Sequence, residues 1–341
     1  MGVDFGSSIP REKIELEDIA GWSLAVDGYN TLYQFLAIIR GADGGHLKDA
    51  RGRVTSHISG LFYRNVNLME LGMKLVYVFD GKPPALKMEE IRRRSAARSE
   101  ANDQYLKALQ AGDMVEARKY AEASTVLRRD MVADAKALLD AMGIPWVDAP
   151  SEGEAQASVM ASEGTVRAVA SQDHDSLMFG APILVRNVTI SGKRRLPSKG
   201  IFVNVQPERI VLSNVLSQLG LTREQLIDYA ILLGTDFNPD GFEGIGPVTA
   251  LKLLRKHGRL EDISELKQRL DGVDYVAIRD LYLNAPALKG VKPEWKPVQR
   301  GKVLEFLVDE HSFSRDRVES ALARLKNVPS AESETLEKWF A

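Results

Sequence analysis

The chain has 341 residues, of which 44% are hydrophobic, and a formal net charge of −2. This length allows one large globular domain or two, and no apolar run is long enough to span a bilayer. The absence of cysteine excludes disulfides, thiolate catalysis and cysteine–zinc sites, and the 5 histidines are too scattered for a histidine zinc site. The start lacks the features of a signal peptide, so we expect a cytoplasmic protein whose chemistry rests on carboxylates, hydroxyls, Lys or Arg.

The first eighty residues predict two repeats of strand, acid and helix. Asp27 follows the first strand and Asp80 follows the second. The expected elements are the strand Trp22 to Val26, the helix Tyr29 to Ile39, a glycine-rich loop over 41–52, the helix Ser56 to Leu71 and the strand Leu75 to Phe79.

The segment from Ala85 to Tyr120 is highly charged, weakly apolar and rich in helix-forming residues. Its composition is poorly suited to a hydrophobic core. For most of the segment, a solvated pair of surface helices without a functional role is the alternative interpretation. Basic residues gather at its start: Lys87, Arg92, Arg93, Arg94 and Arg98.

An acidic stretch over 150–178 follows a helix from Val126 to Met142 and a strand from Ile144 to Val147. It supplies two carboxylate pairs, Glu152 with Glu154 and Asp173 with Asp175, joined by an expected helix from Ser151 to Glu163 and a strand from Val166 to Ala170. Four carboxylates at one place repel unless cations lie among them, and Mg²⁺ prefers such oxygen ligands. An ordinary capping box between Ser151 and Glu154 is the alternative.

Strands that alternate with helices predict an α/β fold with a mainly parallel sheet, whose ligands bind beyond the carboxyl ends of the strands. Asp27, Asp80 and Asp173 lie just past such ends, although an acid there also commonly caps the next helix. Further strands are expected at Ile183 to Ile190 and Gly200 to Val205, separated by a basic turn at Lys193-Arg194-Arg195, with mostly helix from Pro207 onward.

A third feature begins at Gly234-Thr235-Asp236 and continues with Gly244-Ile245-Gly246-Pro247 before a helix from Ala250 to His257. Bare amides at a helix start bind phosphate, and the cations Lys252, Arg255, Lys256 and Arg259 follow. The glycines could equally form a tight turn. Together with the metal site expected at the edge of the sheet, this unit predicts a phosphodiester substrate. The unit would hold that substrate through the sugar-phosphate backbone of one strand.

These motifs together resemble the flap endonucleases, structure-specific 5′ nucleases of DNA replication and repair, and most closely their archaeal branch. The resemblance runs nearly end to end. The matching segments are Met1-Gly2-Val3, Val26-Asp27-Gly28, the run from Val78 to Pro84, the run from Glu152 to Ala157, the run from Ser171 to Asp175, Gly234-Thr235-Asp236 and Gly244-Ile245-Gly246-Pro247.

The resemblance implies roles for individual residues. The metal-binding acids would be Asp27, Asp80, Glu152, Glu154, Asp173, Asp175 and Asp236, with Asp80 and Asp173 indispensable to catalysis. Lys87 and Arg94 match basic residues that the family directs at the scissile phosphate. The expected DNA-binding residues are Tyr33, which would stack on a base, and Gly234, Gly244, Gly246, Lys252, Arg255 and Lys256.

The implied fold is the PIN-like 5′ nuclease fold with a helical arch and a helix-hairpin-helix type DNA-binding region. We expect one nuclease domain over 1–326, with an N-terminal region to about 100, the arch at about 84–125, an intermediate region at about 126–260 and a helical part over 261–326. The implied activity is that of a monomeric 5′ flap endonuclease and 5′-3′ exonuclease, acting on flap, nicked or junction DNA. It would use two Mg²⁺ ions, for which Mn²⁺ could substitute.

The tail over 327–341 is expected to be a polar linker that ends in a binding box. Leu336, Trp339 and Phe340 fall on one helical face and resemble the family's sliding-clamp (PCNA) box, with Ser333 where a Gln is usual. A terminal helix packed on its own core is the alternative.

Three other functions compete with this interpretation. One is a related 5′ nuclease for bubbles or junctions, and another is a non-catalytic clamp-associated DNA-binding protein, against which the complete acid set argues. The third is a cation-binding module without a nucleic-acid role, which leaves the cluster Lys252 to Arg259 unexplained.

Overall fold

A seven-stranded sheet forms the centre of the molecule in the computed structural model, which describes residues 3, 5–41, 45–195 and 202–325. Its strands, in spatial order, are β1 (Glu12–Lys13), β9 (Glu208–Val211), β6 (Ile183–Arg186), β5 (Ala168–Ala170), β2 (Ser23–Asp27), β3 (Lys74–Phe79) and β4 (Trp146–Asp148). The five strands from β6 to β4 are parallel, whereas β9 pairs antiparallel with β6 and β1. The predicted mainly parallel sheet is therefore confirmed.

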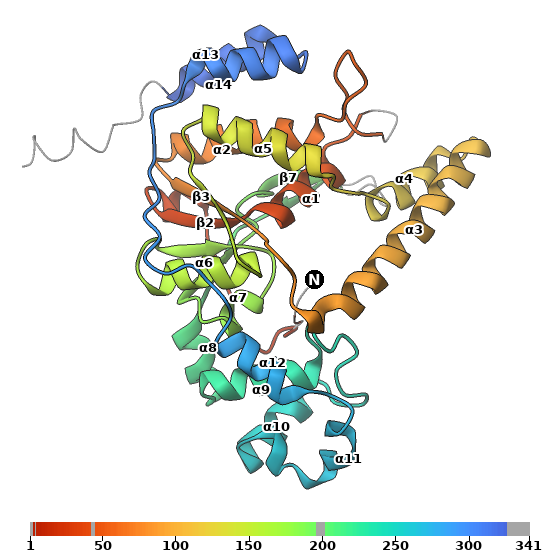
Figure 1. Ribbon diagram of the computed structural model, residues 1–341, viewed down its shortest axis with the longest axis vertical. Helices are drawn as coiled ribbons and strands as arrows, with labels where there is room; N and C mark the ends of the chain where they lie inside the picture. The colour runs from red at the N-terminus through yellow and green to blue at the C-terminus, as the bar shows by residue number, and fades with distance from the viewer. Residues whose placement is uncertain (1–2, 4, 42–44, 196–201, 326–341) are drawn as a thin grey trace, which may run out of the picture.

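Helices cover both faces of the sheet (Figure 1). One side carries α1 (Gly28–Ile38), α2 (Ser56–Glu70) and α5 (Arg129–Ala141), with α13 (Arg300–Leu304), a π-helical turn (Glu305–Glu310) and α14 (Arg315–Arg324) beyond them. The other side carries α6 (Gly153–Ser162), α7 (Asp175–Met178), α8 (Leu212–Leu219), α9 (Arg223–Leu233), α10 (Pro247–His257), α11 (Lys267–Leu270) and α12 (Tyr275–Leu283).

Alternation along the central strands produces these two cores. Leu24 and Val26 of β2 face the α2 side, while Ala25 between them faces the α6 side. All three side chains are fully buried. Because both faces of the parallel sheet are covered, its strands are continuous apolar runs, and the functional acids can lie only at the strand ends.

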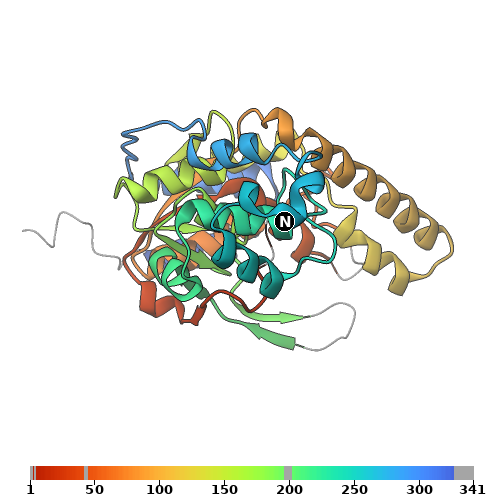
Figure 2. The same cartoon turned by 90° about the horizontal axis from the view of Figure 1, so that it is seen from below.

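The arch, formed by α3 (Met88–Gln110) and α4 (Met114–Ala123), projects sideways from the body (Figures 1 and 2). Its two helices meet through small buried residues, Ala101 and Ala108 on α3 and Ala117 and Ala121 on α4. Arg40 secures the end of α4, since its guanidinium donates to the Ala121 carbonyl at 2.6 Å. The charged segment thus forms a helical hairpin outside the main core, as its composition predicted.

One expectation about the strands is wrong. Lys193-Arg194-Arg195 is not a turn but belongs to β7 (Gly192–Arg195), which pairs antiparallel with β8 (Phe202–Val205) in a ribbon outside the main sheet (Figure 2). The described chain after Pro207 is mostly helical, as expected, although the short strand β9 comes first. Other boundaries shift by a few residues: the expected strand Ile183 to Ile190 ends at Arg186, and β4 begins at Trp146.

Candidate active site

Three predicted acids converge because their strands are neighbours. Asp27 is the last residue of β2, Asp80 follows β3, and Asp173 lies between β5 and α7. Since β2 lies between β3 and β5 and all three are parallel, the three carboxylates emerge at one edge of the sheet.

The remaining acids reach the same place from helix ends. Glu152 and Glu154 lie at the start of α6, Asp175 begins α7, and Asp236 follows α9. Carboxylate oxygens of Glu154, Asp173 and Asp175 lie within 4.8 Å of one another. A pocket of about 770 Å³ is lined by all the predicted acids except Asp175, which lies deeper and is 3% exposed.

Local hydrogen bonds fix several of these carboxylates. Asp80 accepts a bond of 2.6 Å from the Gly153 amide at the start of α6. A Cβ atom at position 153 would lie 2.7 Å from the Asp80 carboxylate, so any larger residue there would displace that carboxylate. The N-cap of α6 is Glu152 and has no side-chain capping bond, so the alternative capping box between Ser151 and Glu154 does not form.

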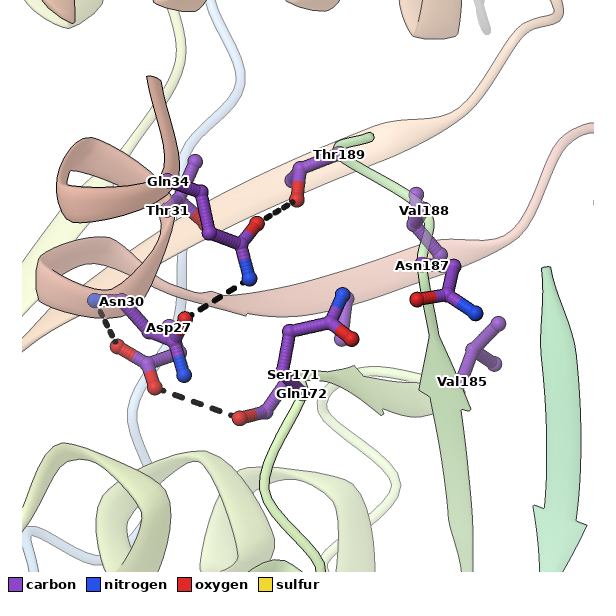
Figure 3. Close-up of a pocket in the computed structure, with 11 residues that line it drawn as sticks. Asp27, Asn30, Thr31, Gln34, Ser171, Gln172, Val185, Asn187, Val188 and Thr189 are labelled. Atoms are coloured by element: carbon purple, nitrogen blue, oxygen red, sulfur yellow. Dashed lines mark hydrogen bonds between the residues drawn. The ribbon is translucent and has the colours of Figure 1, made fainter. Parts of the chain in front are cut away.

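Asp27 both caps a helix and lies in the acidic cluster, the two roles considered for it. One carboxylate oxygen caps α1 by accepting from the Asn30 amide at 3.0 Å, and the other accepts from the Ser171 hydroxyl at 3.3 Å (Figure 3). Ser171 also donates to Glu154 at 2.7 Å, so its hydroxyl lies between two of the predicted acids. Gln34 donates to the Asn30 side chain and accepts from the Thr189 hydroxyl, each at 2.9 Å, in a small second pocket that shares Asp27 with the acidic one (Figure 3).

The cluster carries more buried negative charge than its own cations neutralise. Burial, together with the charge of Asp80, raises the pKa of Asp27 to about 7. Burial and then the charge of Asp173 raise the pKa values of Glu154 and Asp175 well above their ordinary range. Carboxylates that are crowded and buried in this way are stabilised in the ionised form by added cations. An all-oxygen donor set fits hard divalent ions such as Mg²⁺.

Lys87 and Arg94 contact the acids from the base of the arch. The Lys87 ammonium forms ion pairs with Glu152 and, at 3.1 Å, with Asp236. Arg94 pairs with Asp236 and, at 2.6 Å, with Glu90. Burial alone would raise the pKa of Asp236, but the positive charges of Lys87 and Arg94 hold it below its usual value.

Tyr33 lies on the wall of the same pocket. Its hydroxyl accepts a bond of 2.8 Å from Arg98 of the arch, and the Arg98 guanidinium lies 5.8 Å from the centre of the ring. The aromatic side chain is therefore close to the acids and in contact with the arch. Its expected stacking on a base stays a prediction.

The second predicted nucleic-acid contact is at the start of α10. Gly244 has a φ of 77°, which L side chains rarely adopt, and Gly246 is the N-cap before Pro247 at the first helical position. Lys252 and Lys256 are exposed on α10. Arg255 has a structural contact instead, since its guanidinium donates to the Leu219 carbonyl at 2.7 Å and so caps α8. Gly234 lets the chain turn after α9, with a φ of 108°.

Two contacts to Asp175 were not predicted. The Val3 amide donates to one Asp175 oxygen and the Tyr282 hydroxyl donates to the other, each at 3.0 Å. Neither has a sequence signal as a site residue, because Val3 acts through its backbone and Tyr282 lies in an apolar helical stripe typical of core. Ser171, by contrast, begins the motif run Ser171 to Asp175 and could have been chosen as a candidate.

Comparisons with known proteins agree with this geometry. Residues 8–101 match the XPG N-terminal domain and residues 143–236 the XPG I-region. Flap endonuclease 1 of Pyrococcus furiosus is 51% identical over 341 residues, which cover 100% of this chain and 99% of that protein. The chain belongs to the flap endonuclease family. The predicted family and the function as a flap endonuclease are thereby confirmed.

Solved structures support the same conclusion. Flap endonuclease-1 from Methanococcus jannaschii matches with a TM-score of 0.73 and 39% identity, covering 96% of this chain and 98% of that one. The catalytic core of Rad2, solved in complex with DNA substrate, matches with a TM-score of 0.69 and 24% identity over 92% of this chain and 96% of that one. At that identity the likeness shows only the fold, which confirms the predicted 5′ nuclease fold of this flap endonuclease.

Other expectations stay predictions for this flap endonuclease. Leu336, Trp339 and Phe340 lie outside the described residues, and the division of the chain into regions is untested. Among the helices of the described part, none has both the length and the apolar character needed to cross a bilayer.

Proposed function

We propose that this flap endonuclease hydrolyses phosphodiester bonds near single-strand to double-strand junctions in DNA with a 5′ flap, with two Mg²⁺ ions as cofactors. The observation that carries the proposal is the buried surplus of carboxylates beneath the arch, with two cations on its rim. A structural ion-pair network would balance its charges. In the described part of the chain, this cluster instead gathers seven predicted acids, whereas three Lys and Arg side chains line its pocket: Lys87, Arg94 and Arg186.

The acids divide into two groups by their surroundings. Glu154, Asp173 and Asp175 lie together and would hold one ion. A second ion would be held by the remaining acids, which are Asp27, Asp80, Glu152 and Asp236. Bound ions would supply a hydroxide nucleophile at neutral pH and stabilise the leaving 3′ oxygen. Mn²⁺ would substitute, because it accepts the same oxygen ligands.

Lys87 and Arg94 would exchange partners when ions and DNA bind. Both side chains are held against Asp236, next to the acids that would hold the ions. Once ions neutralise the acids, the ammonium and guanidinium groups become available to the scissile phosphate. There they would stabilise the negative charge that develops on the phosphate oxygens in the transition state.

The rest of the substrate would be held without reading its sequence. The amides at the start of α10 and the exposed cations Lys252 and Lys256 suit the phosphates of a duplex strand. The arch has a charged surface, and its lower end lies beside the acidic cluster. Such a structure suits a single-stranded 5′ flap. Such contacts select a junction by shape.

Cleavage assays test this function directly. End-labelled flap, nicked and four-way junction DNAs of the same sequence are incubated with the protein in Mg²⁺ or in EDTA. We expect Mg²⁺-dependent cleavage near the flap junction, with the flap cut fastest. Faster cleavage of the four-way junction would favour the related junction nucleases, and no cleavage in any metal would contradict an enzymatic role.

We also propose that residues 327–341 tether a monomeric enzyme to a sliding clamp (PCNA). The support is the sequence alone: Leu336, Trp339 and Phe340 at spacings of three and one place an aliphatic and two aromatic anchors on one helical face. A tether of this kind raises the local concentration of enzyme at the junction.

A further inference from the structure

The Asp175 carboxylate is held by two protein donors that come from opposite ends of the chain. The Val3 amide donates to Oδ1 and the Tyr282 hydroxyl donates to Oδ2, each at 3.0 Å. A carboxylate oxygen can accept about two hydrogen bonds, so both oxygens keep a lone pair for an ion. The two bonds together fix the rotation of the carboxylate about its own axis.

Tyr282 cannot move away from this contact easily. It is 1% exposed, and its ring packs against Phe179, which follows α7, and Phe237, which follows Asp236. The ring centroids lie 4.8 Å and 5.3 Å away, respectively. The tyrosine is thus wedged between the segments that carry two of the predicted metal ligands.

Arg223 fixes the backbone of Tyr282 relative to Asp175. Its guanidinium donates to the Tyr282 carbonyl and to the Met178 carbonyl at the end of α7, both at 2.9 Å. Asp175 begins that short helix. The arginine therefore ties the helix that carries the hydroxyl to the helix that carries the carboxylate, and the distance between the two groups is set by a rigid connection.

We propose that Tyr282 is a positioning residue of the metal centre, whose hydroxyl holds the Asp175 carboxylate where it lies with Glu154 and Asp173. The proposal rests on the proposed function, since it assigns those acids to an ion. The ring alone accounts for the packing against Phe179 and Phe237, and among the described residues the hydroxyl bonds to Asp175. Groups that orient metal ligands in this way typically contribute ten- to a hundredfold in metal affinity.

The position of Tyr282 also joins the metal centre to the helical layer that bears the predicted DNA contacts. On the same helix, Arg279 pairs with Asp228 of α9 at 2.8 Å. Helix α10, with Lys252 and Lys256, packs against α9, and its Leu254 is buried in the same apolar core. The hydroxyl bond to Asp175 is therefore a direct link from this layer to an acid of the site.

Tyr282→Phe isolates the hydroxyl because it keeps the ring. Mn²⁺ binding to the metal-free protein is measured by calorimetry without DNA, so that the readout does not depend on cleavage. We expect the affinity of one Mn²⁺ to fall by about ten- to a hundredfold. The Mn²⁺ concentration for half-maximal cleavage should rise by a similar factor, while the KM for flap DNA and the rate at saturating Mn²⁺ stay near those of the wild type.

Tyr77→Phe is the matched control. Tyr77 is also fully buried and its hydroxyl also donates one bond, to Asn65 at 2.8 Å, but it lies in the core on the other face of the sheet. Loss of the Tyr77 hydroxyl should affect the melting temperature of the protein and leave its affinity for Mn²⁺ unchanged. In an Asp175→Ala background, Tyr282→Phe should cause no further loss of affinity, because the two groups act as a unit.

The outcomes separate this inference from the proposed function. Wild-type affinity in Tyr282→Phe, or equal losses in Tyr282→Phe and Tyr77→Phe, would overturn the positioning role while the nuclease assignment stands. A further loss in the Asp175→Ala background would also overturn it. A wild-type protein that binds no Mn²⁺ would overturn the proposed metal centre itself, and the positioning role with it.

Discussion

Lys87 and Asp236 form an ion pair with 3.1 Å between the ammonium nitrogen and a carboxylate oxygen, although they come from the base of the arch and from the loop after α9. The contact joins the base of the projecting hairpin to the acidic cluster at the carboxyl edge of the sheet. It places a protein cation beside two of the predicted acids, Asp236 and Glu152. The basic residues of the arch are therefore already poised at the acids before any substrate is bound.

Replacing Lys87 or Arg94 with Ala should lower the single-turnover cleavage rate by about 10²- to 10³-fold, because these charges stabilise the transition state. The affinity for flap DNA should change little. Rapid-quench assays and binding titrations measure the two quantities separately. Arg93→Ala is the control on the same helix, since Arg93 pairs with exposed Asp240 and should be dispensable. Equal losses of affinity and rate would make Lys87 and Arg94 ordinary backbone contacts.

Asp173→Ala and Asp80→Ala should each abolish cleavage in Mg²⁺, with a loss of at least about a thousandfold, or about 4 kcal/mol of transition-state stabilisation. Binding of flap DNA should persist, because the proposed contacts to the duplex phosphates lie at the start of α10. Asp148→Ala is the control, since Asp148 also ends a strand of the sheet but pairs with Lys136 at 2.6 Å. An Asp173→Ala protein that cuts flaps at nearly the wild-type rate would show that the metal assignment is wrong.

Lys252 and Arg255 should differ in a way that the sequence did not suggest. Lys252→Ala should weaken DNA binding and reduce the slope of log affinity against log salt by about one. Arg255→Ala should in addition lower the melting temperature, because it removes the cap on the Leu219 carbonyl. Salt titrations and thermal unfolding check both effects. An unchanged salt slope in Lys252→Ala would count against a phosphate contact.

The acids were predictable because their signal is local. Asp27, Asp80 and Asp173 each follow an apolar run that reads as a buried strand, and parallel strands bring their carboxyl ends together. The strand order could not be derived from these runs. It depends on which strands pair: β2 lies between β3 and β5, and β9 lies between β1 and β6.

The parts that sequence reasoning missed lack a local signal. Only Ile210 of β9 is buried, so the strand shows no apolar alternation. The β7–β8 ribbon lies outside the main sheet, where no apolar face is needed, and its basic residues resembled a turn. The partners of Asp175 are 172 and 107 positions away in the chain, at Val3 and Tyr282. Such contacts arise from tertiary packing alone.

Deleting residues 333–341 should abolish stimulation by the sliding clamp and leave clamp-free cleavage and the melting temperature nearly unchanged. The reason is that a tail with three anchors gains its affinity from the groove of a partner. Phe340→Ala in the full chain should reduce stimulation in the same direction. A large fall in melting temperature with stimulation intact would instead show that the tail packs on the enzyme's own core.

The stability of the protein in mild acid should depend on a pair of histidines far from the active site. His57 of α2 is fully buried, and its ring nitrogen lies 4.0 Å from Asp134 of α5. His311, after the π-helical turn, lies 3.6 Å from the same carboxylate. Burial lowers the pKa of His57 to about 4, against the opposing charge of Asp134. Burial alone would lower the pKa of His311, but its bonds to Asp134 and the Phe306 carbonyl raise it.

The sign of the effect follows from the proton balance. The unfolded chain protonates His57 near its ordinary pKa of about 6.5, whereas the folded protein does so only near 4, so the unfolded state binds more protons in between. The contribution of His57 is present above pH 6.5 and is lost as the pH falls through 4, by about 3 kcal/mol in all. His57→Leu should therefore lose less stability than the wild type between pH 6.5 and 4.5, as measured by urea unfolding at several pH values. Parallel pH profiles for the two proteins would show that His57 takes up its proton without unfolding, and that its burial does not set the acid stability.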